Sequence, residues 1–162
     1  MIVLVGFMGA GKTTVGRLLA AKLGIPFIDS DHVIAARVGK PIPQIFADDG
    51  EPAFRHLEHE VIAELVHGED IVLAVGGGAA THQGTRALLA AATVPVVYLR
   101  VSYAVAMNRV GGDRGRPMLA RPDVADVYAA RAPRYDQAAT FTVDADDKTP
   151  EELALAILAG LR

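Results

Sequence analysis

The sequence of 162 residues contains neither cysteine nor tryptophan, and only 6% of its residues are aromatic. The absence of cysteine excludes disulfide bonds, cysteine-ligated zinc and a thiol nucleophile. The longest apolar run, residues 87–99, is interrupted by Thr93 and Pro95 and is shorter than the ~20 apolar residues that a membrane span requires. An excess of basic charge is also missing, because the net charge is −3. The overall charge of the protein therefore does not favour binding to nucleic acid or to an anionic membrane.

The first residues lack a basic region and run directly into a glycine-rich turn, which argues against a signal peptide and predicts a cytoplasmic protein. No repeat, low-complexity linker or break in composition divides the chain, so we expect one domain over residues 1–162. We further expect a monomer whose partners are small molecules, with no nucleic acid and no membrane.

Short apolar runs alternate along the chain with longer segments of helical periodicity. We expect strands over 2–5, 26–28, 71–75, 94–99 and 140–143. We expect a helix over 13–23, a second one that follows residues 29–31 and ends at about 38, and two within 42–66 with a break at 48–50. Further helices are expected over 83–91, 102–110, 124–134 and from 150 onward. Nearly continuous apolar strands of this kind form a parallel sheet covered by helices. Ligands of such sheets bind beyond the carboxyl ends of the strands, where glycines and aspartates follow three of the runs.

Residues 6–13 read GFMGAGKT and fit the pattern G-x-x-x-x-G-K-[ST] of a nucleotide phosphate-binding loop. The glycines allow successive backbone N–H groups to point at an oxyanion, and the start of the following helix adds partial positive charge. Lys12 is placed to reach the β- and γ-phosphates, and the Thr13 hydroxyl can ligate Mg²⁺. A glycine-rich turn can be purely structural, but a lysine and a threonine in this register have no packing purpose.

Asp29 and Asp31 lie one residue apart at the end of a predicted strand, which points them roughly the same way. One aspartate can serve Mg²⁺, and the other can orient a substrate hydroxyl or accept its proton. The alternative is that Asp31 only caps the following helix.

Three consecutive glycines, Gly76, Gly77 and Gly78, end the predicted strand over 71–75. They remove side chains from the wall of a ligand site and expose backbone N–H groups. A tight structural turn is the alternative.

Six of the twelve arginines fall between positions 109 and 134, so an anionic ligand is expected there. Arg116 lies in a basic, glycine-containing loop that can close over a bound triphosphate and exclude water. Arg131 can hold a carboxylate in bidentate geometry, and exposed helix surface is the alternative for Arg131 and Arg134.

Arg55 and Glu58 lie three residues apart on a predicted helix, where a weak surface ion pair is the alternative to a functional pair. The histidines show no pairing with an evident role and are expected at the surface or as helix caps: His32, His56, His59, His67 and His82.

In order along the chain, these motifs resemble the shikimate kinase family. The matching positions are 6–16, 29–31, 45–46, 50–51, 54–55, 58, 76–78, 116–119, 131 and 135. The phosphate-binding loop alone is widespread, whereas the ordered combination is specific. The resemblance implies ATP-dependent phosphorylation of the 3-hydroxyl of shikimate, a step toward chorismate and the aromatic amino acids. It also implies an α/β fold of the P-loop NTPase, nucleoside-monophosphate-kinase-like type, with a five-stranded parallel sheet, a substrate-binding segment over about 31–60 and a lid over about 111–121.

The resemblance further implies a role for each matched residue. The nucleotide would contact Gly9, Ala10, Gly11, Lys12, Thr13, Thr14, Arg109, Arg116 and Pro150, with adenine between Arg109 and Pro150. Mg²⁺ would be bound by Thr13 directly and by Asp29 through water. Shikimate would contact Asp31, Phe46, Phe54, Arg55, Glu58, Gly76, Gly77, Gly78 and Arg131. Lys12, Asp31 and Arg116 would be catalytic, Arg55 and Arg131 would hold the carboxylate, and Glu58 would fix Arg55.

The chain departs from the family at 144–149, which is mostly acidic where family members often carry a basic residue before the last helix. Two other functions stay open. One is another small-molecule kinase of the same fold, such as a gluconate or nucleoside monophosphate kinase. The other is a non-catalytic ATP-binding module, which the loss of Lys12, Thr13, Asp31 or the lid arginine would have favoured; all four are present.

Overall fold

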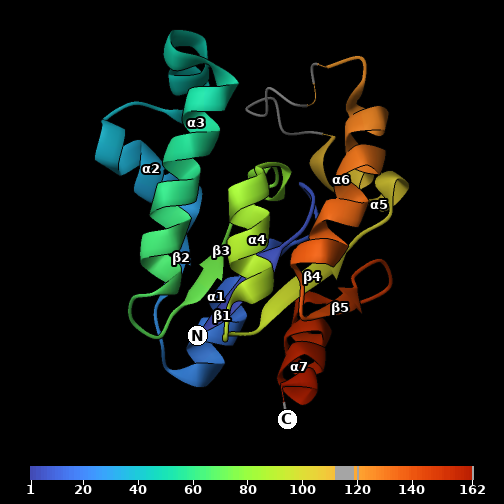
Figure 1. The fold of residues 1–162 in the computed structure, drawn as a ribbon. Helices are drawn as coiled ribbons and strands as arrows, with labels where there is room; N and C mark the ends of the chain where they lie inside the picture. The colour runs from blue at the N-terminus through green and yellow to red at the C-terminus, as the bar shows by residue number, and fades with distance from the viewer. Residues whose placement is uncertain (112–118, 120, 162) are drawn as a thin grey trace.

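The computed structural model describes residues 1–111, 119 and 121–161, and it has a five-stranded parallel sheet between helices (Figure 1). The strands are β1 (Ile2–Val5), β2 (Phe27–Asp29), β3 (Val72–Ala74), β4 (Val96–Arg100) and β5 (Phe141–Asp144), in the spatial order β2-β3-β1-β4-β5. The central strand β1 pairs with β3 and β4, and all of its residues are buried. The α/β class and the parallel sheet predicted from the apolar runs are confirmed.

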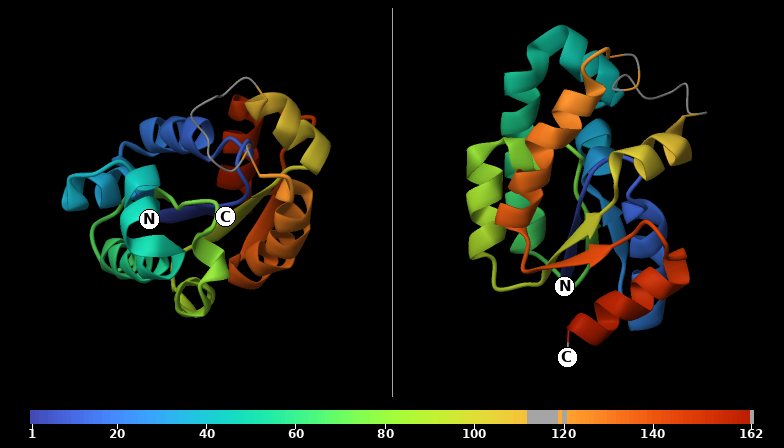
Figure 2. Two further views of the ribbon diagram at one scale, coloured as in Figure 1. Left: turned by 90° about the horizontal axis from the view of Figure 1, so that it is seen from above. Right: turned by 90° about the vertical axis from the view of Figure 1, so that its right-hand side faces the viewer.

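Helices cover both faces of the sheet. They are α1 (Lys12–Leu23), α2 (Ser30–Val38), α3 (Ile42–Val66), α4 (Gln83–Ala91), α5 (Tyr103–Val110), α6 (Val124–Ala138) and α7 (Pro150–Gly160), with a short 3₁₀ turn η1 (Ala79–Thr81). Helices α1 and α7 pack together on one face, and α3, α4 and α6 lie on the other (Figure 2). None of the helices in the described part of the chain is long and apolar enough to cross a membrane.

Helix boundaries follow the sequence signals at most positions. Helix α7 begins at Pro150, as predicted, where Thr149 caps it and forms a reciprocal capping box with Glu152. The predicted break at 48–50 is a kink at Gly50, whose φ of 79° lies in the left-handed region. Helix α6 runs through Pro133 to Ala138, past its predicted end at 134, because the buried Tyr135 and Ala138 pack against the core beyond the proline.

The apolar side chains form two clusters. The main core surrounds the sheet, and a smaller cluster of Ile34, Ile45, Phe54 and Val61 joins α2 to α3. Leu65 packs against both. The segment that carries α2 and the first half of α3 therefore has a small core of its own.

Candidate active site

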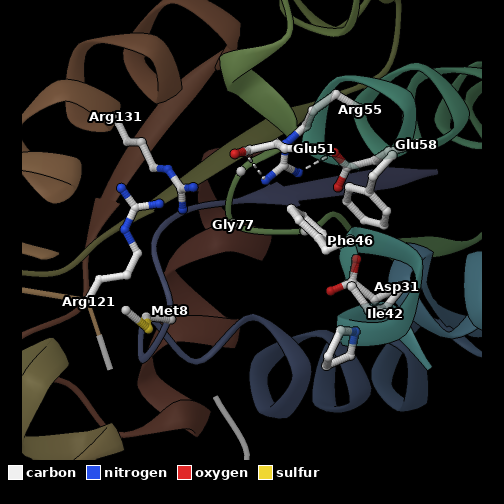
Figure 3. Close-up of a pocket in the computed structure, with 14 residues that line it drawn as sticks. Met8, Asp31, Ile42, Phe46, Glu51, Arg55, Glu58, Gly77, Arg121 and Arg131 are labelled. Carbon is white, nitrogen blue, oxygen red and sulfur yellow. Dashed lines mark hydrogen bonds and ion pairs between the residues drawn. The ribbon is translucent and has the colours of Figure 1, made fainter. Parts of the chain in front are cut away.

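A cavity of about 530 Å³ is lined by residues that follow β1, β2 and β3 (Figure 3). Its lining comprises Met8, Asp31, Ile42, Pro43, Phe46, Glu51, Phe54, Arg55, Glu58, Gly76, Gly77, Gly78, Arg121 and Arg131. The carboxyl ends of the three strands thus meet at one edge of the sheet, as the sequence predicts. All the residues that the resemblance assigned to the acceptor substrate lie in this one lining.

Sequence reasoning missed five of the lining residues: Met8, Ile42, Pro43, Glu51 and Arg121. The sequence places Met8 in the phosphate-binding loop, and it places Arg121 in the predicted lid and among the six arginines expected near an anionic ligand. Arg121 is held by an ion pair with Asp123, in which Nη2 and Oδ2 are 2.6 Å apart. For Ile42 and Pro43, the sequence carries no signal beyond the start of a helix.

Arg55 stands in the cavity between carboxylates and aromatic rings (Figure 3). Its Nη1 donates to Oε2 of Glu58 at 2.5 Å, and its Nη2 donates to Oε1 of Glu51 at 3.3 Å. The guanidinium carbon lies 5.1 Å from the ring centroid of Phe54 and 5.7 Å from that of Phe46. These contacts hold the planar group in one orientation, which is what bidentate recognition of a carboxylate requires.

Glu58 is not part of a surface ion pair, so that alternative is wrong. The residue is 0% exposed, and its Oε1 has no hydrogen-bond partner among the described residues. Burial raises the pKa of Glu58 to about 7, although Arg55 opposes the shift. Ionising this carboxyl group in the native protein therefore costs free energy of desolvation. Its hydrogen bond with Nη1 holds the Arg55 guanidinium in place.

Glu58→Gln is expected to flatten the pH dependence of stability. Between pH 4.5 and 7 native Glu58 retains a proton that the unfolded chain has released, so rising pH favours unfolding. This one group contributes a fall of at most about 1.4 kcal/mol per pH unit to the free energy of unfolding. Urea titrations of wild type and variant from pH 5 to 8 measure the difference.

Glu64→Gln on the same helix is the matched control. Glu64 is exposed, and its hydrogen bond with Arg37 lowers its pKa, so its contribution to stability is lost as pH falls, which is the opposite sign. A slope between pH 5 and 7 that is the same in Glu58→Gln as in wild type would show that Glu58 is not the group responsible.

The side chain of Arg131 is buried, with 8% of its surface exposed, so the alternative that it lies on an exposed helix surface is wrong. It forms no ion pair within the described part of the chain, and burial lowers its pKa. Its guanidinium carbon lies 6.0 Å from the ring centroid of Phe7. A buried cation without a carboxylate partner is costly unless an anion binds to it. Arg134, which is half-buried, does not line the cavity.

The phosphate-binding loop joins β1 to α1 as predicted. Gly9 and Gly11 have φ values of 77° and 91°, which other residues adopt only with strain. No side chain caps α1, whose first N–H groups are therefore available to an anion. Nζ of Lys12 donates to the carbonyl oxygens of Gly6 and Phe7 at 2.7 and 3.1 Å, which holds the ammonium group over the loop.

Asp29 and Asp31 have different surroundings although they lie one residue apart. Oδ1 of Asp29 accepts from the backbone N–H of Asp31 at 3.0 Å and caps α2. The alternative that Asp31 is the cap is wrong, because β2 ends at Asp29 and α2 begins at the next residue. Burial and the neighbouring Asp29 raise the pKa of Asp31, while Lys12 and Arg55 oppose the shift. Asp31 is thus a cavity carboxylate of increased basicity.

Two of the three glycines lie in close contact with the charged side chains of the cavity, so they are more than a structural turn. A Cβ on Gly76 would lie 2.5 Å from Oε1 of Glu58 and 2.9 Å from Oδ1 of Asp31. A Cβ on Gly78 would overlap the guanidinium of Arg55. Any larger residue would displace these groups from the cavity wall.

The expected adenine contacts lie near the phosphate-binding loop. Arg109 donates to the carbonyl oxygen of Gly9 at 3.2 Å and to that of Ala145 at 2.7 Å. It thereby joins the loop to the acidic segment that precedes Pro150, the first residue of α7. Oδ1 of Asp146 in that segment accepts from the N–H of Ser102 at 2.8 Å, so one of its acidic residues is structural. Arg116 and most of the predicted lid lie outside the described residues.

Three of the five histidines have side-chain partners, one of them being His56 at the surface, whose Nε2 lies 3.4 Å from Oε1 of Glu60. His59 and His82 have ring centroids 5.0 Å apart, and both Nδ1 atoms lie within 3.2 Å of the Thr85 hydroxyl. Nδ1 of His82 accepts from the N–H of Thr85 and caps α4, so the expected capping role is confirmed there.

Comparisons with known proteins agree with this geometry. The family model described as shikimate kinase matches residues 8–162. The chain is 47% identical over 164 residues to the shikimate kinase of Thermobifida fusca, which covers 99% of this chain and 94% of the relative. It is 45% identical over 163 residues to the enzyme of Mycobacterium avium, covering 98% of this chain and 92% of the relative.

Solved structures separate the family from others of the same fold. Shikimate kinase from Acinetobacter baumannii in complex with shikimate matches with a TM-score of 0.92 and 40% identity over 99% of this chain and 91% of that one. A gluconokinase from Sinorhizobium meliloti, 24% identical with a TM-score of 0.60, shares the fold alone. With a family model covering residues 8–162 and relatives this similar over more than nine-tenths of their length, the chain belongs to the shikimate kinase family.

Proposed function

We propose that this protein transfers the γ-phosphoryl group of ATP to the 3-hydroxyl of shikimate, giving shikimate 3-phosphate and ADP. One observation carries the proposal: two arginines, Arg55 and Arg131, line the same cavity as Asp31, at the strand edge where the phosphate-binding loop lies. A small hydroxylated acid fits this combination of cations and a carboxylate. The related enzyme of Acinetobacter baumannii binds shikimate itself, which supports the same acceptor here.

The two guanidinium groups bind the substrate carboxylate. Arg131 supplies a buried positive charge that has no acidic partner in the described structure. Arg55 supplies a second one, oriented by Glu58 and by the rings of Phe46 and Phe54. Together they fix the acid at one end of the cavity and leave its hydroxyls facing the other.

Asp31 acts on the hydroxyl that is phosphorylated. Its raised pKa makes it a better proton acceptor than an ordinary aspartate, and it lies close enough to Lys12 for that cation to lower its pKa. The carboxylate accepts a hydrogen bond from the hydroxyl and takes its proton as the oxygen attacks phosphorus. A side chain at position 76 would collide with Asp31, so the glycine there leaves room for the Asp31 carboxylate in the cavity wall.

The phosphate-binding loop, Lys12 and the N-terminus of α1 hold the triphosphate. A hydroxyl and a carboxylate are the oxygen donors that Mg²⁺ prefers, and Thr13 and Asp29 provide them at the ends of neighbouring elements. Mg²⁺ would neutralise the charge that develops on the phosphate oxygens. Arg116, outside the described residues, is proposed as a further cation at the transferred group from the resemblance alone.

A coupled assay of ADP release tests the proposal. Turnover with MgATP is expected with shikimate and not with gluconate or a nucleoside monophosphate. A preference for gluconate or a nucleoside monophosphate would instead support another kinase of this fold. ATP binding with no turnover on any of the three would support the non-catalytic module.

A further inference from the structure

Tyr135 stands behind the triple glycine, outside the cavity. The side chain is 2% exposed, belongs to α6 and is not among the residues that line the cavity. Its hydroxyl donates to the carbonyl oxygen of Gly77 at 2.5 Å, although the two residues are 58 positions apart in sequence. Gly77 itself lines the cavity (Figure 3), so this bond anchors the cavity wall from its rear.

The anchored carbonyl decides which way the next N–H points. The described peptide bonds are all trans, and in a trans peptide the C=O of one residue and the N–H of the next point in opposite directions. Because Tyr135, which does not line the cavity, holds the Gly77 carbonyl, the N–H of Gly78 points away from Tyr135. Within the described residues this N–H donates no backbone hydrogen bond.

Two adjacent glycines cannot hold this peptide orientation by themselves. Glycine populates positive and negative φ about equally, so a peptide between two glycines rotates more easily than any other. Neither residue carries a side chain that packs against a neighbour. The hydrogen bond from Tyr135 to the Gly77 carbonyl opposes this rotation.

The same tyrosine lies beside one of the substrate cations. Arg131 and Tyr135 are four residues apart on α6 and so share a helix face. Burial raises the pKa of Tyr135, and the Arg131 guanidinium opposes this shift. A Cβ built on Gly77 would lie 3.9 Å from Nη1 of Arg131. The phenol, the Gly77 peptide and the guanidinium therefore form one contiguous group.

We infer that Tyr135 is a positioning residue for the acceptor substrate: it fixes the Gly77–Gly78 peptide so that the Gly78 N–H is a preset donor to a substrate hydroxyl, beside the Arg131 cation. This inference rests on the proposed function. The residue touches neither the substrate nor the nucleotide, and its effect is confined to the binding of the hydroxylated acid.

Tyr135→Phe is the test, with Tyr128→Phe as its matched control. Tyr128 lies on the same helix, and its hydroxyl also donates to a backbone carbonyl, that of Val101, at 2.8 Å. Both variants lose one hydroxyl-to-carbonyl bond, so we expect both to lower Tm. Only Tyr135→Phe is expected to raise KM for shikimate, by about tenfold, the loss of one well-placed hydrogen bond. We expect KM for ATP to stay within twofold of wild type and kcat to fall less than KM rises.

An unchanged KM for shikimate in Tyr135→Phe would overturn the inference, and so would an equal rise in Tyr128→Phe. A parallel loss of ATP affinity in Tyr135→Phe would also overturn it, because it would indicate a general structural effect. Wild-type turnover in the same assay separates the two proposals. Its absence overturns the proposed function and this inference together, whereas normal wild-type turnover with an unaffected Tyr135→Phe overturns the inference alone.

Discussion

Asp31→Asn is expected to lower kcat for shikimate phosphorylation by about 10²–10⁴, the usual contribution of a positioned acid or base. The amide is nearly the same size, so the cavity keeps its shape, but it cannot accept the hydroxyl proton. It also removes the negative charge that faces Lys12 and Arg55. We expect KM for ATP to change little, because the triphosphate is held by the loop and α1. Steady-state kinetics with each substrate varied in turn gives both constants.

Asp136→Asn is a suitable control for that variant. Asp136 is an exposed aspartate on α6 that does not line the cavity, and its loss is expected to leave both constants unchanged. Turnover of Asp31→Asn near that of wild type, with the fold verified by circular dichroism, would remove Asp31 from the chemical step.

Arg131→Ala is expected to raise KM for shikimate by about 10–100-fold, as for a lost hydrogen bond to a charged group. The substrate carboxylate keeps Arg55 but loses the cation that has no competing acidic partner in the described structure. Measured KM for ATP should remain close to that of wild type. Arg131→Lys is expected to recover only part of the affinity, because an ammonium cannot form the planar bidentate pair.

Arg134→Ala supplies the comparison on the same helix. Arg134 lies outside the cavity, so its loss should leave KM for shikimate unaltered. If Arg131→Ala weakened ATP binding and left shikimate binding intact, the carboxylate assignment would be wrong and Arg131 would belong to the nucleotide site.

The sequence predicted most of the fold because its signals are local. Continuous apolar runs predicted the five strands, and the last helix begins at Pro150 as predicted. The acceptor-side residues were assigned through the resemblance to the family, and they line one cavity from α2, α3, α6 and the segment after β3. The strand order, in which β3 lies between β2 and β1, was not predicted from the sequence.

Other features depend on contacts between distant segments and leave no local signal. Glu58 is polar and looks solvent-exposed by sequence, yet it is covered on all sides when α3 packs against the segment after β3. The bond from Tyr135 to Gly77 joins residues 58 positions apart. Helix α6 extends four residues beyond its predicted end at 134, because Tyr135 and Ala138 pack into the core.

The small cluster between α2 and α3 has a consequence for how this protein can change. Ile34, Ile45, Phe54 and Val61 stabilise the acceptor side almost independently of the sheet, with Leu65 as the shared neighbour. Free energies of mutations at sites without shared partners are nearly additive. Substitutions at Ile34, Ile45 and Val61, which do not line the cavity, should therefore change the stability of the acceptor side and leave the phosphate-binding loop in place.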